Sequence, residues 1–192
     1  MKKILVFTLF IMMSFNSSYG QEVFYLHAVK ISDSEVENFE NIQREYVTEL
    51  AQDAKKNGII KDWVLLKPIR NVGEATEQEY NYVWVHIFEN VEQMTSRTDW
   101  WRNSKEKFGI DPAVLYKGEL LKSGYYYWKT EKQIEASRDG QYIIMNWATP
   151  KDLGKALTMA DELSEGFRKN MKKEGMAAWG VASKILPQGE GQ

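Results

Sequence analysis

The 192-residue sequence contains no cysteine. This absence excludes a disulfide framework and a lipid anchor on a cysteine, so the fold must be held together by packing. Histidine is also scarce, because His27 and His86 are the only two. A zinc site normally takes more protein ligands than two histidines supply, and we therefore predict no metal site.

Familiar catalytic motifs are missing as well. The sequence has no G-x-S-x-G nucleophile elbow, no glycine-rich phosphate loop and no H-E-x-x-H pair. These absences weaken the hydrolase and nucleotide-enzyme interpretations.

Long hydrophobic runs are absent too. The one apolar run, residues 4–13, is about half the length of a membrane-spanning helix, and we predict no membrane span. It follows Lys2 and Lys3 and precedes the small residues Ser18 and Gly20, which is the pattern of a secretory signal peptide. We predict a signal peptide over residues 1–20, cleavage near Gly20–Gln21, and a periplasmic or secreted protein. An N-terminal anchor helix that is never cleaved is the alternative.

Positive charge is in deficit. Removing residues 1–20 takes away two lysines and no acids, so Lys+Arg falls from 25 to 23 against 27 Asp+Glu, and the net charge is 23 − 27 = −4. The densest basic run, residues 168–173, ends a predicted helix, where cations complement the helix dipole. We therefore do not predict a nucleic-acid partner.

The remaining pattern is one of alternating strands and helices. Branched and aromatic residues predict strands over residues 23–31, 63–69 and 80–88, and a last strand within 115–128. Helices are predicted after Ser32 and over residues 91–108, the first of them ending at Gly58. The apolar face of the first helix consists of Val36, Phe39, Ile42, Tyr46, Leu50 and Ala54.

The second half of the sequence repeats the first. An offset of 117 residues carries the six apolar helix positions onto Leu153, Ala156, Met159, Leu163, Phe167 and Met171. The same offset places Tyr25 on Tyr142 and Gly58 on Gly175, and with one residue lost Trp63 falls on Trp179. We predict a first unit over residues 21–128 and a second, incomplete unit over 129–192.

The first unit reads strand, helix, strand, strand, helix, strand. Such a unit forms an antiparallel sheet in the order 4-1-3-2 with helices on one face. The element order and the duplication resemble the dimeric α+β barrel superfamily, in which two ferredoxin-like sheets pack face to face. The resemblance spans residues 23–192 and implies an α+β fold, with a tandem repeat forming the barrel. The incomplete second unit is either part of a longer chain or is completed by other strands or another subunit, such as that of a homodimer.

Strand alternation predicts where chemistry could occur. Val83, Val85 and Ile87 are predicted to face the helices. The opposite, open face would then line the barrel interior with the six candidate ligand-binding residues Tyr25, His27, Tyr82, Trp84, His86 and Phe88. Either histidine could act as a catalytic base or bind haem iron. Simple packing of the interior is the alternative.

Two further clusters have alternative interpretations. Trp100 and Trp101 could form a lid over a pocket or anchor a helix to its sheet. Lys67 and Arg70 could meet an anionic group or protect an edge strand.

Three functions fit these features. The first is an exported protein that binds a small hydrophobic or planar molecule in an aromatic interior. The second is a monooxygenase-like or haem-handling enzyme of the α+β barrel type, with haem as the one cofactor considered. The third is a structural, self-associating envelope protein.

Overall fold

The computed structural model describes residues 21–69, 79–96, 99–116, 120–135 and 140–186. Over these residues the chain forms one open antiparallel sheet of five strands in the order β2-β3-β1-β4-β5. The strands are β1 Val23–Ile31, β2 Asp62–Leu66, β3 Tyr82–Phe88, β4 Leu120–Ile134 and β5 Trp179–Leu186. The α+β class is confirmed, and the order of the first four strands is the one predicted from the sequence.

The first predicted helix is continuous but not α-helical throughout. It consists of α2 Val36–Ile42, a π-helical turn (η2) Gln43–Val47 and α3 Thr48–Lys56. The chain leaves the helix through Gly58, whose φ of 68° is in the left-handed region that glycine adopts without strain. The π turn adds one residue to the local repeat and so changes the direction of the side chains around it.

The remaining helical segments are short, except for the last. Beside the 3₁₀ turn η1 Asp33–Glu35 they are α4 Val91–Thr95, η3 Trp100–Asn103, α5 Ser104–Phe108, η4 Pro112–Tyr116 and α6 Leu153–Asn170. The predicted single helix over residues 91–108 is thus divided into α4, η3 and α5. None of the helices in the described ranges is long and apolar enough to cross a membrane.

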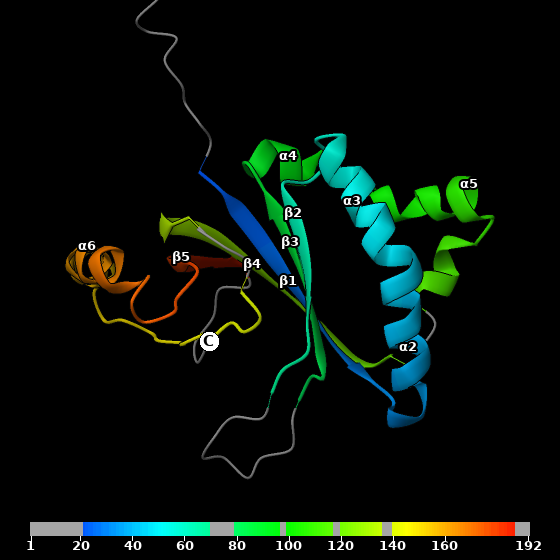
Figure 1. The fold of residues 1–192 in the computed structure, drawn as a ribbon, viewed down its shortest axis with the longest axis horizontal. Coiled ribbons are helices and arrows are strands. Elements are labelled where there is room, and N and C mark those ends of the chain that lie inside the picture. Colours follow the sequence, from blue (N-terminus) through cyan, green and yellow to red (C-terminus); the bar gives the residue numbers. More distant parts are fainter. Residues whose placement is uncertain (1–20, 70–78, 97–98, 117–119, 136–139, 187–192) are drawn as a thin grey trace, which may run out of the picture.

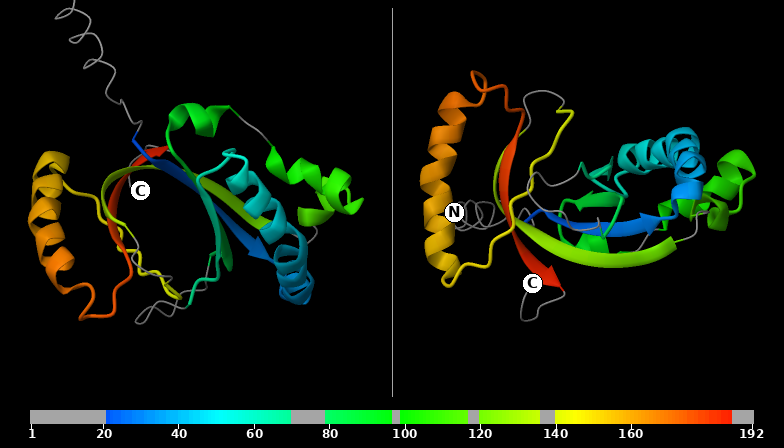
Figure 2. Two further views of the ribbon diagram at one scale, coloured as in Figure 1. Left: turned by 45° about the horizontal axis from the view of Figure 1, so that its top comes forward. Right: turned by 90° about the horizontal axis from the view of Figure 1, so that it is seen from below.

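The strands β1 to β4 separate two groups of elements. Helices α2, α3 and α5 lie on one side of them, whereas β5 and α6 lie on the other side (Figure 1). Strand β4 connects the two groups because its first part pairs with β1 and its last part pairs with β5. Register shifts interrupt the β4–β5 pairing, and such irregularities bend a strand. Figure 2 shows that β5 is turned away from the direction of β1.

The main core lies between the sheet and α2–α3. One buried cluster contains Ile42, Leu50 and Ala54 of the predicted helix face together with Trp100 and Leu115. A second cluster joins Phe39 to residues of β1 and β3. The other face of the sheet is covered in part by the second half of the chain, where Trp147 packs on Trp128 with ring centroids 5.0 Å apart.

The second half matches its predicted repeat only in part. Helix α6 and strand β5 form as predicted, and Gly175 has a φ of 74°, close to that of Gly58. The predicted strand around Tyr142 does not form, because residues 140–150 have no regular secondary structure. The helix is capped by Asp152, whose carboxylate accepts a 3.0 Å hydrogen bond from the Lys155 amide. The cap predicted from the repeat is Thr149, which the offset of 117 residues aligns with Ser32.

The strand predicted around Tyr142 is missing because, in the described part of the chain, no neighbouring strand forms backbone hydrogen bonds with it. A strand forms only where a neighbouring strand satisfies its backbone groups. Within the described chain no strand pairs with residues 140–150.

The predicted signal peptide, residues 1–20, lies outside the described residues, as does Arg70. The unit boundary predicted after residue 128 falls within β4 and stays a prediction.

Candidate functional site

The two histidines lie on neighbouring strands and on one face of the sheet. In the antiparallel register of β1 and β3, Tyr25 is opposite His86 and His27 is opposite Trp84. The imidazoles are therefore diagonal neighbours, close enough to share one site. The strand parity deduced from the sequence gives the same juxtaposition.

This face is not the open one, so the predicted orientation of the sheet is wrong. Phe39 of α2 packs on Tyr82 and Trp84, with ring centroids 4.6 and 5.5 Å apart, which places the aromatic face beneath the helix. Alternation sorts side chains into two faces but does not say which face the helix covers. Large rings fill the space under a helix, while Val85 is buried on the opposite face.

His86 is enclosed by aromatic rings. Its imidazole stacks on Tyr25 with centroids 4.4 Å apart and an interplanar angle of 15°, and Trp100 lies 5.9 Å away. The side chain is only 7% exposed. Within the described residues its buried Nδ1 has no hydrogen-bond partner. Such an orphaned polar atom is rare in a folded protein and costs about 1–3 kcal/mol.

His27 has partners on both sides. Its ring stacks on Tyr125 of β4 at 4.0 Å and is tilted against Trp84 at 4.9 Å. Its Nε2 shares a 2.9 Å hydrogen bond with the Ser123 hydroxyl, also on β4. The central strand β1 is therefore joined to β4 through side chains as well as through the backbone ladder.

Both histidines are neutral at physiological pH. Burial lowers the pKa of His27 from 6.5 to about 4. Burial, followed by repulsion from the His27 imidazole, lowers the pKa of His86 to about 3. Each neutral ring offers one N–H donor and one nitrogen acceptor, which suits hydrogen bonding to an uncharged partner.

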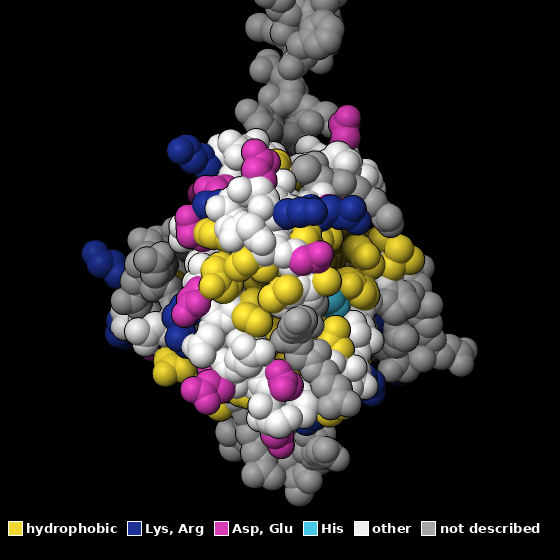
Figure 3. Space-filling model, turned by 90° about the vertical axis from the view of Figure 1, so that its right-hand side faces the viewer, with side chains coloured by type: hydrophobic (Ala, Val, Ile, Leu, Met, Phe, Trp, Pro, Cys, Tyr) yellow, Lys and Arg dark blue, Asp and Glu magenta, His cyan; other side chains and the backbone are white. Residues whose placement is uncertain are grey.

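A cleft of about 550 Å³ opens onto these two rings. This volume is in the range of small-molecule sites. Figure 3 shows histidine atoms at the bottom of a hollow among hydrophobic side chains on the helix side of the molecule. The aromatic residues that line the cleft are Tyr25, Trp63, Trp84, Phe88, Trp100, Trp101, Tyr125 and Tyr127.

One wall of the cleft comes from the segment α4–η3. Trp100 is buried and makes edge contacts with Trp63 and Trp101 at 6.4 and 5.8 Å. Gln93 fixes α4 to the end of the first helix through a 2.8 Å hydrogen bond from its side chain to the Gly58 carbonyl. Trp100 thus packs its segment against Trp63 of the sheet and also lines the cleft, whereas a lid stays a prediction.

The opposite wall depends on the π turn. Gln43, its first residue, is buried and points at the sheet, where its Oε1 accepts a 2.8 Å hydrogen bond from Trp84 Nε1. Its Nε2 donates to the Leu115 carbonyl at 3.2 Å. One amide therefore holds the indole of β3 and the η4 turn in place around the cleft.

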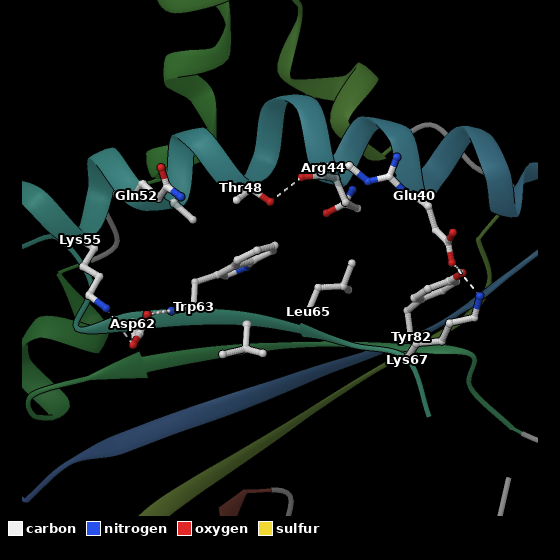
Figure 4. A pocket seen from close by; sticks show the side chains of 13 residues that line it. Glu40, Arg44, Thr48, Gln52, Lys55, Asp62, Trp63, Leu65, Lys67 and Tyr82 are labelled. Atoms are coloured by element: carbon white, nitrogen blue, oxygen red, sulfur yellow. Dashed lines mark hydrogen bonds and ion pairs between the residues drawn. The ribbon is translucent and has the colours of Figure 1, made fainter. Parts of the chain in front are cut away.

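A second hollow lies on the outer side of the same helix. This groove of about 620 Å³ runs between α2–α3 and the edge strand β2. Figure 4 shows Trp63 and Leu65 pointing into it, with the Lys55–Asp62 ion pair at one end and the Tyr82–Glu40–Lys67 group at the other. Lys55 pairs with Asp62 and Lys67 with Glu40, and we assign no binding role to this groove.

The structure places five of the six predicted ligand-binding residues around one cleft. Tyr82 is the exception, because it lines the groove, where its hydroxyl donates a 2.6 Å hydrogen bond to Glu40. Lys67 is paired with the same carboxylate. The prediction missed the β4 residues that close the cleft. Ser123, Tyr125 and Tyr127 alternate along the sequence, and that period of two was the available signal.

The charge of the cleft is low. Asp99 is the acidic residue in its lining and forms a 2.9 Å ion pair with Arg102. Among the described lining residues there is no lysine or arginine. No cluster of three or more potential metal ligands occurs in the part of the chain that the structure describes.

Comparison with known proteins gives no further assignment. No protein-family model matches the sequence, and no curated protein matches it.

Proposed function

We propose that the cleft binds a small, planar, uncharged organic molecule. The observation that carries this proposal is the buried Nδ1 of His86, which has no partner among the described residues, in a ring that lines an aromatic cleft. This nitrogen is buried from solvent. A ligand hydroxyl or amide N–H in the cleft would supply the missing hydrogen bond once the rings packed around His86 move apart.

The lining also favours a neutral ligand over an anion. The described part of the cleft offers aromatic faces and neutral imidazoles but no cation that would neutralise a carboxylate or phosphate. Burying an unpaired charge there would cost several kcal/mol, of the order of the effective penalty for an ion in a protein interior. Planar rings, in contrast, gain from stacking and from the apolar area they bury.

Calorimetric titration with three matched probes tests the proposal. 1-Naphthol carries a hydroxyl, naphthalene lacks it, and 1-naphthoate is an anion of similar size. We expect 1-naphthol to bind about three- to tenfold more tightly than naphthalene, the effect of one hydrogen bond, and 1-naphthoate to bind most weakly. His86→Phe should remove the preference for 1-naphthol and retain the affinity for naphthalene.

Tyr82→Phe is the matched control, because it changes an aromatic residue on the same strand that faces the groove instead of the cleft. It should leave all three affinities unchanged. The proposal fails if none of the probes binds, or if His86→Phe retains the preference for 1-naphthol.

The enzyme alternative uses the same cleft. A monooxygenase-like or haem-handling protein would need His27 or His86 as a base or iron ligand. A haemin titration separates this function from simple binding: a Soret shift abolished by His27→Ala or His86→Ala would favour it, and the absence of a shift would exclude the haem form.

Export and family membership complete the proposal. Residues 1–20 act as a cleavable signal peptide, and N-terminal sequencing of the exported protein should begin at Gln21. The chain is a tandem α+β barrel protein of ferredoxin-like units. Two observations support this: the strand order β2-β3-β1-β4, and the pairing of β5, the second strand of the repeat, with β4.

A further inference from the structure

The first unit shows how two half-units interlock. One half is β1, the helix α2–α3 and β2, and the other half is β3, the short helices and β4. In the sheet order β2-β3-β1-β4, the first strand of each half lies inside and the second strand lies outside. Exchanging the two halves gives the order β4-β1-β3-β2, which is the same sheet read from its other edge. The unit therefore has an approximate twofold axis between β1 and β3.

Residues 140–186 contain one such half-unit. They hold α6, β5 and, before the helix, the segment 142–147, which the sequence repeat aligns with β1. The outer strand β5 has one neighbour, β4, and is the last strand of the described sheet. Within the described residues the segment 142–147 has no neighbouring strand and no regular secondary structure.

The side chains of this half-unit suit a fully covered central strand. Tyr142, Ile143, Ile144, Met145 and Trp147 are apolar on both faces, as β1 is, yet they are between 41% and 86% exposed. Helix α6 presents more apolar surface than β4 and β5 cover. It buries Ala160 but leaves Leu153, Met159 and Leu163 half or more exposed. A contiguous apolar run of this kind is typical of a strand buried between two layers.

We propose that a second copy of this chain completes the half-unit by strand exchange. Segment 142–147 of each copy pairs with β5 of the other copy, and the two segments pair antiparallel with each other across a twofold axis. Across the sheet the strands then follow in the order β5 of one copy, segment 142–147 of the second copy, segment 142–147 of the first copy, and β5 of the second copy. It reproduces the arrangement of the first unit, with the second copy in the place that β3, the short helices and β4 take there.

The charges and edges of the sheet agree with this pairing. Residues 140–150 contain no charged side chain, so antiparallel self-pairing brings no like charges together. Strand β5 has Lys184 as its one charged residue. The other edge strand, β2, is shorter and is followed directly by Lys67 and Pro68, which discourage pairing with another chain. Of the two described edges, β5 is therefore the one open to a partner strand.

The mass of the purified protein in solution is the first test. Light scattering after gel filtration should give twice the mass of one chain. Ile144→Lys should convert the dimer to a monomer, because it places a charge in the centre of the paired segments. Ile69→Lys is the matched control: Ile69 is 74% exposed, lies beyond β2, and should tolerate lysine without loss of the dimer.

Cysteine cross-linking is the second test, and it does not depend on how Ile144→Lys folds. The chain has no native cysteine, so single substitutions report on one position each. Residues beside the twofold axis lie opposite themselves or opposite a close neighbour in the sequence, at a Cβ separation that a disulfide spans. At least one of Ile143→Cys, Ile144→Cys and Met145→Cys, alone or mixed with another of the three, should form a disulfide-linked dimer on mild oxidation, whereas Ile69→Cys should not.

A monomeric wild-type protein overturns the proposal. A dimer that none of the three cysteines cross-links, alone or in mixtures, also overturns it, because the interface then lies elsewhere. Cross-linking at Ile69→Cys as strong as at residues 143–145 would mark random collision and would overturn it as well. Naphthol binding is measured independently of these outcomes, since the proposed cleft lies on the other side of the sheet.

Discussion

The indole Nε1 of Trp84 donates a 2.8 Å hydrogen bond to the side-chain oxygen of Gln43, the first residue of the π-helical turn. The same amide donates to the Leu115 carbonyl. Helix, sheet and the η4 turn therefore meet at one buried polar side chain. Such a connection stabilises only while every partner is present, because each orphaned group in the core is costly.

Gln43→Leu should accordingly destabilise the protein. It fills the same space but leaves the Trp84 N–H and the Leu115 carbonyl without their partner, and we expect a loss of about 2–4 kcal/mol in the free energy of unfolding. Urea unfolding measures it. Gln52→Leu, an exposed position on α3 of the same helix, should stay within about 0.5 kcal/mol of wild type. Equal effects at both positions would refute this role of Gln43.

The buried histidines predict a loss of stability in mild acid. Their pKa values are about 4 and about 3 in the folded chain, against 6.5 when they are unperturbed. Well above pH 6.5 both states are neutral and the effect vanishes. Below it the unfolded chain binds protons that the folded chain does not, so the free energy of unfolding falls by up to about 1.4 kcal/mol per histidine and pH unit.

Unfolding curves between pH 7 and 5.5 isolate this effect from the carboxylates, which titrate lower. His86→Phe should reduce the slope by about half, because one of two titrating groups is removed while an aromatic ring still stacks on Tyr25. A slope unchanged by the substitution would show that the acid sensitivity has another origin.

The strands of the first unit could be predicted closely from the sequence. The range predicted for β1 agrees with Val23–Ile31, and the alternation in β1 and β3 places His27 and His86 on one face. The orientation of that face could not be predicted, because Val85 on the opposite face of β3 is buried too and alternation does not say which face meets the helix. The π turn was also missed, since apolar spacings of three and four occur in α-helices and in helices with one such turn.

The second half illustrates a different limit. The repeat predicts α6 and β5 correctly because a helix is stabilised by its own backbone bonds and β5 finds β4 as a partner. It fails at Tyr142 because a strand needs a neighbour that sequence similarity does not supply. The β4 contribution to the cleft, from Ser123 to Tyr127, was missed because the range of the last strand was predicted only loosely.

Tyr82 should contribute to stability through one hydrogen bond to a carboxylate. Its hydroxyl donates to Glu40 at 2.6 Å, and Lys67 donates to the same oxygen at 2.7 Å. Tyr82→Phe should cost about 1.5 kcal/mol, as expected for a hydrogen bond to a charged group. Lys67→Met should cost less than about 0.5 kcal/mol, because this lysine is exposed and its ion pair is screened by water. The reverse ranking in urea unfolding would contradict this assignment.

The affinity for 1-naphthol should not change near pH 6.5, where an ordinary histidine titrates. Burial keeps the pKa of His86 at about 3 and that of His27 at about 4, so both rings are already neutral throughout pH 5.5–7.5. A hydroxyl that hydrogen-bonds to neutral His86 lowers its pKa further, and affinity should fall only when the pH approaches 4. Calorimetry across this range is the measurement, with naphthalene as the probe that lacks the hydrogen bond. A tenfold change in the affinity for 1-naphthol centred on pH 6.5 would mean that a protonated imidazole binds the ligand, and the cleft would then select for acceptors or anions instead.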